Sequence, residues 1–476
     1  MGEVGAGEVP KRPSVPREIS HILGWRGLVL AVALAAAVPA FGGEPAEELD
    51  RYGGWRQTRS AATGWFRTWR SGGRWWLVDP SGRPFLSIGV NGVSLRDGAA
   101  RGAERSAYGE AALGKYGSES AWAAAAVARL RGWGFNTLGG GCEAATRRQA
   151  MPYAVTLNLL DLLERREEQT FPDVFDPAYE TAVRRYVMRV CRPVAEDPYL
   201  IGYFAGEDPG WGADRKSRKT LFAQFVALDD RAPGRRRLLW FLENRYLNIA
   251  EMNEVWGTTY QSFEQVGRVP QVGSKIPDHD VDDFMWAVAR EYFRIAHDAI
   301  RAVDEHHLLL GCRFAGDAPE PVLEAMGDYV DAVSLKASGE RPPAAHLRKT
   351  HRITGRPVLI AEFTVCLGGA AATQQERGER YEAYVEELLA LPMVVGFHWV
   401  EHADRAPETL ARGEVNCGLV NAEDGPYSAF AVAVQRANRA AYGLAGIDRY
   451  TESEEGEGEA AGAAVPPNKR AGRREY

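Results

Sequence analysis

The chain has 476 residues, of which 45% are hydrophobic and 10% aromatic, which is enough apolar material for a large core. Its formal net charge of −7 comes from well-mixed acidic and basic residues, which argues against a nucleic-acid-binding surface. Five cysteines without a Cys-x-x-Cys pair argue against a zinc site and against a dense disulfide framework. An odd count leaves at least one thiol unpaired, and no metal or other cofactor is indicated.

The first forty residues are typical of an export segment. Basic residues precede the apolar run GLVLAVALAAAV, and the small residues of VPA, at 38–40, suit a cleavage site. The uncharged stretch is at the short edge for a membrane span. We therefore predict that residues 1–40 are a signal peptide, with a retained signal anchor as the alternative. The protein is expected to be exported, to the periplasm or outside the cell, and to touch a membrane only if this segment stays uncleaved.

The next part of the chain predicts a small β-meander. Residues 41–83 form a lead-in with a β-hairpin, and the strand-like stretches are GWFRTW, RWWLVD and PFLSIGVN. The intervening RSGG and DPSG are good turn signals.

From PFLSIGVN onward, eight short apolar runs alternate with amphipathic helical segments. The later runs are GFNTLG, YAVTLNL, LIGYF, HLLLGCRF, VDAVSLKA, PVLIAEF and VVGFHWV. Apolar, β-branched runs suit parallel strands that are buried on both faces. The pattern predicts an α/β fold, a (β/α)₈ TIM barrel over residues 84–446. An open doubly wound sheet is the alternative, weakened because no glycine-rich dinucleotide fingerprint follows the first strand.

Two further segments stand apart from this alternation. The connection after the fourth strand is much longer than the others and contains helical patterns, so residues 209–280 are predicted to be a helical insertion. The tail, residues 447–476, has almost no large apolar side chains and is predicted to be disordered.

Polar side chains follow the predicted strands of the barrel. Active sites of such barrels form at the carboxyl ends of the strands. The residues at those ends, in chain order, are Asn91, Asn136, Asn158, Glu207, Asp208, Arg313, Lys336, Glu362, His398 and Trp399.

Glu362 is the strongest of these candidates. PVLIAEF places one carboxylate in an otherwise apolar strand, where an unpaired charge is costly. An ion pair with Arg313 is the structural alternative. Together with an acid after the fourth strand, Glu362 fits the two-carboxylate arrangement of glycoside hydrolysis, in which one acid protonates the leaving oxygen and the other attacks or activates water.

Several motifs together resemble one enzyme family. GRWWLVDPSGRPFLSIGVNGV, DVFDPAY, DPYLIGYF, NEVWGTTYQSFEQV, GCRFAG, RPVLIAEF and VVGFHWVEHAD are similar to the agarase-like branch, and its β-galactosidase relatives, of the retaining (β/α)₈ glycoside hydrolases. The resemblance extends from about Gly64 to Leu444.

The resemblance implies roles for particular positions. Glu362 matches the nucleophile, Trp399 the aromatic floor of the sugar site, and His398 and Arg313 its polar lining. The family's strand-four motif ends in Asn-Glu, and Glu207 and Asp208 stand in those two slots. We also expect Asn91, Asn136 and Trp211 to bind substrate, although Trp211 could instead cap the insertion.

The sequence therefore predicts an exported retaining glycosidase that acts on β-linked, galactose-type oligo- or polysaccharides. Glu362 would be the nucleophile, and Asp208 or Glu207 the acid/base. The main alternative is a catalytically silent carbohydrate-binding barrel, because the Asn-Glu pair is changed here. A membrane-anchored surface protein is a weaker alternative. The sequence leaves the oligomeric state open.

Overall fold

The computed structural model describes residues 48–96, 98–99, 104–163, 171–207, 210–211, 215–269, 275–366, 373–410 and 415–452. The predicted export segment, the candidate acid Asp208 and most of the predicted tail lie outside the described residues. The chain divides into two compact units, Met1–Ala40 and Phe41–Tyr476, and all described residues belong to the second.

The predicted β-meander is confirmed as a three-stranded antiparallel sheet with the order β1-β2-β3. Its strands are β1 (Arg67–Ser71), β2 (Arg74–Val78) and β3 (Pro84–Phe85). Gly72 and Gly73 join the first two strands with φ angles of 61° and 71°. Two successive positive φ values are what a tight two-residue hairpin needs, and glycine adopts them without strain.

The predicted barrel is also confirmed. A nine-stranded sheet, in which all neighbouring strands are parallel, has the order β8-β7-β6-β5-β4-β12-β11-β10-β9. The strands are β4 (Ser87–Val90), β5 (Thr137–Leu138), β6 (Tyr153–Thr156), β7 (Leu200–Phe204), β8 (Leu308–Leu309), β9 (Phe314–Ala315), β10 (Val333–Lys336), β11 (Val358–Phe363) and β12 (Val394–Trp399).

The two edges of this sheet, β8 and β9, belong to one short stretch of chain. Gly311, with φ of 69°, lies between them. The predicted fifth strand, HLLLGCRF, is thus broken at a bend, and its first half pairs with β7 while its second half pairs with β10. Because β8 and β9 are two halves of one strand, the nine-stranded sheet closes on itself as a barrel of eight strands, as a (β/α)₈ barrel requires.

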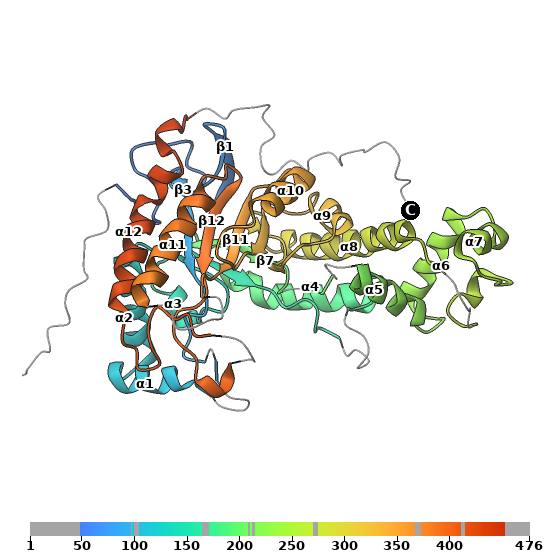
Figure 1. Ribbon diagram of the computed structural model, residues 1–476, viewed down its shortest axis with the longest axis horizontal. Helices are drawn as coiled ribbons and strands as arrows, with labels where there is room; N and C mark the ends of the chain where they lie inside the picture. The colour runs from blue at the N-terminus through green and yellow to red at the C-terminus, as the bar shows by residue number, and fades with distance from the viewer. Residues whose placement is uncertain are drawn as a thin grey trace, which may run out of the picture. The chain divides into compact units, whose positions relative to one another are not determined.

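Helices follow the strands and form the outer layer (Figure 1). Packing of α4 on α8, α8 on α9, α9 on α10 and α11 on α12 connects this layer. The helices are α1 (Ala107–Tyr116), α2 (Glu119–Gly132), α3 (Ala144–Arg147), α4 (Pro177–Cys191), α8 (Asp278–Arg301), α9 (Glu320–Met326), α10 (Ala344–Thr354), α11 (Gln374–Leu389) and α12 (Ser428–Leu444). Short 3₁₀ turns occur at Arg192–Val194, Phe263–Gln265, Pro407–Thr409 and Ile447–Arg449.

Local sequence explains where several helices begin. The Ser118 hydroxyl accepts a hydrogen bond from the third residue of α2, and Asp176 caps α4, whose first residue is Pro177. Thr373 and Glu376 form a reciprocal capping box at the start of α11. These side chains satisfy backbone N–H groups that have no partner inside the helix. Within the described residues, no helix is both long enough and apolar enough to cross a membrane.

The helical insertion after the fourth strand is confirmed. It contains α5 (Arg215–Ala227), α6 (Pro233–Arg245) and α7 (Ile249–Trp256), which lie between β7 and α8 in the chain. Phe284 of α8 packs against Phe222, Phe225 and Phe241, with ring centroids 5.3 to 5.7 Å apart. These aromatic contacts give the insertion a core of its own against the first half of α8.

The start of the predicted disordered tail is corrected. Residues 447–452 are described, and Tyr450, only 6% exposed, packs its ring edge-on against Trp76 of the meander. The backbone N–H of Thr451 donates to the Ser71 hydroxyl at 2.7 Å. Burial of Ile447 and Tyr450 and the bonds of Thr451 to Ser71 dock this stretch, and residues 453–476 lie outside the described residues.

The lead-in fills one end of the barrel. Tyr52, Phe66 and Phe85 belong to a buried cluster that also contains inward-facing strand residues such as Ile201 and Leu359. A second cluster fills the space between the strands and the helices. Because the lead-in occupies the amino end of the strands, the carboxyl end is the one left for a site.

Candidate active site

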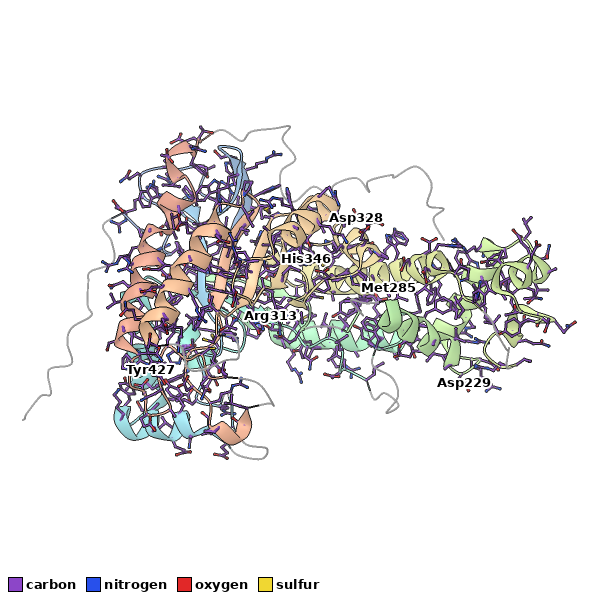
Figure 2. All side chains as sticks on the ribbon, viewed as in Figure 1. Asp229, Met285, Arg313, Asp328, His346 and Tyr427 are labelled. Atoms are coloured by element: carbon purple, nitrogen blue, oxygen red, sulfur yellow. The ribbon has the colours of Figure 1, made fainter. Side chains whose placement is uncertain are left out.

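Four charged side chains meet at the carboxyl ends of neighbouring strands. Glu207 follows β7, Arg313 lies between β8 and β9, Lys336 ends β10, and Glu362 lies near the end of β11. We call these four residues the charge cluster; Arg313 is labelled in Figure 2. A backbone bridge between Glu207 and Arg313 extends the barrel pairing to this point.

Both carboxylates of the charge cluster bind the same two cations. Arg313 contacts Glu207 at 2.5 Å and Glu362 at 3.1 Å. The Lys336 nitrogen lies 2.6 Å from Glu207 Oε1 and 3.2 Å from Glu362 Oε2. Because both oxygens contact the same nitrogen, Glu207 Oε1 and Glu362 Oε2 are at most about 5.8 Å apart. Glu207 and Glu362 thus face each other, with the cations between them.

Exposure differs within the charge cluster. The side chain of Glu207 is 43% exposed and that of Glu362 is 23% exposed, whereas Arg313 is 7% exposed. Burial by itself lowers the pKa of Lys336, but attraction to Glu362 and Glu207 outweighs it, so the pKa of this lysine is raised. Lys336 therefore stays an ammonium ion, and a ligand can reach both carboxylates.

Asn91 holds the backbone beside Glu362 in place. Its side-chain N–H donates to the Ala361 carbonyl at 2.8 Å, and its side-chain oxygen accepts from the Gly140 N–H at 2.8 Å. Arg313 also donates to the Ala361 carbonyl, at 3.2 Å. Asn91 is 3% exposed with its amide engaged by backbone groups, so we correct its predicted role from sugar binding to positioning.

The prediction that Asn136 lies at the site is wrong. β5 begins at Thr137, so Asn136 stands at the amino end of that strand, opposite to the charge cluster. Its side chain accepts from the Ile88 N–H and donates to the Leu86 carbonyl. It therefore ties the beginning of β4 to the beginning of β5. The carboxyl end of β5 is followed by glycines, Gly139 to Gly141, which bring no side chain to the rim.

Trp211 packs against other aromatic rings instead of facing a sugar. It is 3% exposed, and its ring lies 4.5 Å from Phe171, 5.6 Å from Tyr292 and 6.1 Å from Phe293. Trp211 is thus buried against α8 and the segment before α4, which corrects the substrate-binding prediction; the alternative, that it caps the insertion, is not supported by these contacts.

His398 and Trp399 lie on opposite faces of β12, and both are fully buried. His398 points into the barrel, where its Nε2 lies 2.8 Å from the Ser87 hydroxyl. The Trp399 ring faces the helices and packs against Tyr381 of α11 and Phe430 of α12. The side chains of a strand alternate between its faces, so the two cannot both face the site. The predicted role of Trp399 as sugar floor is therefore corrected. His398 lies inside the barrel near Asn91, and its role as polar lining of the site stays a prediction.

The buried His398 leads to a prediction about pH and stability. Burial, assisted by the charge of Arg313, lowers the pKa of His398 from 6.5 to about 3. Below pH 6.5 His398 takes up a proton in the unfolded chain but not in the folded protein. The contribution of this histidine to the free energy of unfolding is therefore fully present above pH 6.5 and is lost as the pH falls. Between pH 7 and pH 5 the titration of His398 is expected to lower the free energy of unfolding by about 2 kcal/mol.

The measurement compares the free energy of urea unfolding at pH 7 and pH 5 for the native chain and for His398→Gln. Glutamine can keep the hydrogen bond to Ser87 but does not titrate, so the pH-dependent loss should shrink by about 2 kcal/mol. Burial raises the pKa of Asp79 to about 8, so this carboxyl increases the free energy of unfolding as the pH falls. The effect is the same in the native chain and in the variant, and it cancels when the two are compared. An unchanged difference between the two pH values would show that His398 is already charged in the folded state.

Lys336 belongs to the charge cluster, whereas the sequence identifies it only as a residue at a strand end. Its signal was present in VSLK, where a lysine ends an apolar strand of the barrel. Asp208, the other candidate acid, lies outside the described residues, and its position relative to Glu362 stays a prediction.

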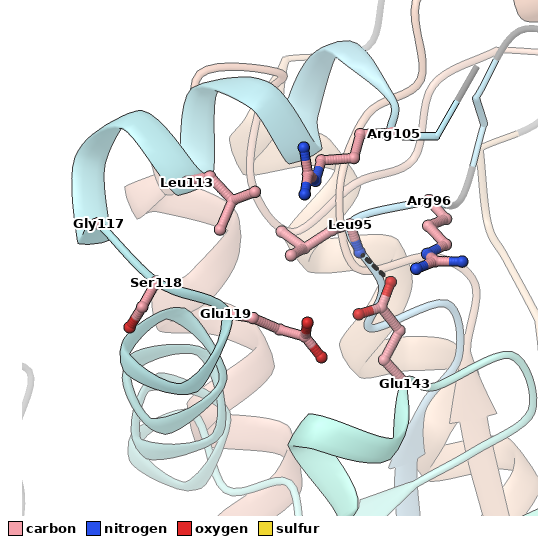
Figure 3. A pocket seen from close by; sticks show the side chains of 8 residues that line it. All are labelled: Leu95, Arg96, Arg105, Leu113, Gly117, Ser118, Glu119 and Glu143. Atoms are coloured by element: carbon pink, nitrogen blue, oxygen red, sulfur yellow. Dashed lines mark hydrogen bonds between the residues drawn. The ribbon is translucent and has the colours of Figure 1, made fainter.

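A separate cavity lies near the start of α2 (Figure 3). It has a volume of about 320 Å³, and Arg96, Arg105, Glu119 and Glu143 supply its charged side chains. Glu143 is engaged in accepting hydrogen bonds from the Ser94 hydroxyl and the Leu95 N–H, at 2.9 Å each. None of its lining residues belongs to the charge cluster. The charge cluster remains the candidate active site because it places two carboxylates at the barrel's strand ends.

Comparison with known proteins gives two curated relatives. β-Agarase A of Vibrio sp. (strain JT0107) is 27% identical over 449 residues, which cover 78% of this chain and 45% of that protein. β-Agarase B of the same strain is 24% identical over 484 residues, which cover 83% of this chain and 50% of that protein. The chain therefore spans about half the length of these relatives. No family model matches the chain.

The fold is shared with a solved structure of an exo-β-agarase. The two superimpose with a TM-score of 0.76 and 22% sequence identity, over 85% of this chain and 69% of that one. This superposition confirms the TIM-barrel fold, and the two curated relatives confirm the resemblance of the sequence motifs to agarase-like proteins.

Proposed function

We propose that this chain is a glycoside hydrolase that cleaves β-linked, galactose-type polysaccharides by a retaining two-carboxylate mechanism. The observation that carries the proposal is the approach of Glu207 to Glu362 across one lysine and one arginine, at the catalytic end of the barrel. The two β-agarase relatives supply the substrate class.

The proposed mechanism begins with Glu362 as the nucleophile. Its carboxylate attacks the anomeric carbon and forms a covalent glycosyl intermediate, while the opposite acid protonates the leaving oxygen and later activates water. Retaining enzymes place the two carboxyl groups about 5–5.5 Å apart, and inverting enzymes about 6.5–9.5 Å apart. The limit of about 5.8 Å between carboxylate oxygens supports the retaining geometry.

Glu207 is the acid that the described geometry favours, because it faces Glu362. Asp208 is the alternative, and its carboxyl is one methylene shorter. Assays of Glu207→Gln and Asp208→Asn on aryl β-galactosides assign the role. The variant that lacks the acid should lose much more activity on a poor leaving group than on a good one, because a good leaving group needs little protonation. If neither variant shows this difference, the two-carboxylate mechanism is wrong.

A catalytically silent carbohydrate-binding barrel is the second candidate function. The observation that favours it is the change of the family's Asn-Glu pair to Glu207-Asp208, with Glu207 ion-paired to both cations. An aryl galactoside with a good leaving group separates the two candidates. Turnover that disappears in Glu362→Gln supports the enzyme, whereas binding of a galactan oligosaccharide without any turnover supports the silent barrel.

Lys336 is predicted to position the two carboxylates. Replacing it with methionine leaves Glu207 and Glu362 close together with one cation fewer, so their side chains should separate. The expected result is a decrease in kcat/KM of roughly 10- to 100-fold. Lys349→Met is a matched control, because Lys349 is a more exposed lysine that pairs with Glu320 away from the charge cluster. Equal activity of the two variants would contradict a positioning role.

We also propose export of the protein, which rests on the sequence of residues 1–40 alone. Determination of the mature N-terminus after expression with the full chain distinguishes a cleaved signal peptide, expected near Ala40, from a retained anchor.

A further inference from the structure

Two cysteines lie close together in the connections that follow β11, the strand of Glu362, and β12. Cys366 lies four positions after Glu362, in the loop that follows β11, and Cys417 lies in the connection that follows β12. The Thr364 hydroxyl contacts both residues, the sulfur of Cys417 and the backbone N–H of Cys366. The other three cysteines, Cys142, Cys191 and Cys312, are buried elsewhere, and none of the five is in a disulfide in this structure.

Thr364 links the backbone of Cys366 to the thiol of Cys417. Its hydroxyl donates to Cys417 Sγ at 3.1 Å and accepts from the Cys366 backbone N–H at 3.1 Å. Arg377 of α11 holds the other side, because its guanidinium donates to the Cys417 carbonyl at 3.3 Å. The backbone of Cys366 and both the thiol and the carbonyl of Cys417 are thus held by neighbouring side chains.

The two thiols differ in accessibility and reactivity. Cys417 is 4% exposed, whereas Cys366 is partly exposed. The hydrogen bond from Cys417, together with the charge of Arg377, lowers the pKa of Cys366 to about 7. The thiolate is the reactive form of cysteine, so Cys366 combines access with reactivity, and Cys417 stands next to it as the second thiol.

We propose that Cys366 and Cys417 are a redox-active pair that closes to a disulfide and so links the loop after β11 to the loop after β12. The oxidant is a disulfide, either a small molecule or a thiol–disulfide exchange protein. The Cys366 thiolate attacks one sulfur of the oxidant and displaces its first thiolate. The Cys417 sulfur then attacks Cys366 and displaces the second. The two protons of the cysteines pass to these thiolates, so one disulfide forms and one is reduced.

The test uses the full chain and oxidised glutathione as the probe. The reduced protein is treated with it, quenched in acid, denatured, and assayed for free thiols. The expected count falls from five to three, and a non-reducing peptide map shows residues 366 and 417 in one linked pair. Dithiothreitol should restore the five thiols and lower the Tm of the oxidised protein by about 2 °C or more.

Variants make the assignment specific. Cys366→Ser and Cys417→Ser should each keep four thiols after oxidation or form only a glutathione adduct. The matched control is Cys191→Ser, which removes a buried cysteine elsewhere and should still fall from four thiols to two. A native chain that keeps five thiols, or that stops at a glutathione adduct on Cys366, would overturn the proposal. The peptide map of the native chain decides even if a serine variant fails to fold.

Discussion

Replacement of Glu362 by glutamine is expected to lower kcat on a β-linked galactan or an aryl β-galactoside by at least about 1000-fold. Glutamine has nearly the same shape, so it can still accept from Arg313 and should leave the fold intact. It cannot form the glycosyl intermediate, because an amide is a poor nucleophile. The measurement is steady-state kinetics together with a Tm close to that of the native chain.

The control for this prediction is Glu382→Gln. Glu382 lies on α11, the helix that follows β11, and pairs with Arg436 at the surface, so the same chemical change is made outside the charge cluster. Its activity should match that of the native chain. Native-like activity of the Glu362 variant would rule out this residue as the nucleophile, and with it the proposed mechanism.

The second large effect is expected from Asp424, which connects the chain after β12 to α1 and α2. Its carboxylate is fully buried and accepts from Lys115 at 2.8 Å, Arg129 at 2.5 Å and Tyr116 at 2.8 Å. These partners, chiefly Arg129, hold the pKa of Asp424 far below its usual range despite burial. The charge is therefore present in the folded protein at every pH above about 4.

Replacement of Asp424 by asparagine should decrease the free energy of unfolding by about 3 kcal/mol or more, because it leaves Arg129, whose side chain is only 14% exposed, without its partner charge. Asparagine keeps the size of the side chain and tolerates the φ of 59° at this position. Urea unfolding at pH 7 measures the change. Glu423→Gln, at the exposed neighbouring position, is the control and should change stability by less than about 0.5 kcal/mol. A similar loss in both variants would mean that the ion pairs of Asp424 contribute little.

The lost stability should also have a pH signature. A carboxylate with a depressed pKa stabilises the folded state above its unfolded pKa and loses this contribution as the pH falls. The difference between the native chain and Asp424→Asn should therefore be largest near neutral pH and shrink below about pH 4.

Repetition of apolar strands and amphipathic helices determined the fold of this chain. The sequence predicts the eight strands, the helical insertion after the fourth strand and the leading meander. Each of these depends on local patterns, such as turn glycines, helix caps and the spacing of apolar residues. Glu362 was readable for a related reason, since one carboxylate in an apolar strand is unusual wherever the strand lies.

Which way a side chain faces was decided only by the tertiary structure. Adjacent residues of a strand point to opposite faces, but the sequence does not say which face is inside, so His398 and Trp399 were both placed at the site. Asn136 was assigned to the wrong end because β5 has only two paired residues, Thr137–Leu138, and its position depends on pairing with β4.

The meeting of Glu207, Lys336 and Glu362 is likewise a property of the closed barrel. Lys336 and Glu362 lie on consecutive, directly paired strands, whereas Glu207 follows β7 and reaches them only because the broken fifth strand lies between β7 and β10. The sequence alone established that charged residues stand at strand ends. Closure of the sheet brought two carboxylates and two cations within hydrogen-bonding distance, because parallel strands in a barrel present all their carboxyl ends to one rim.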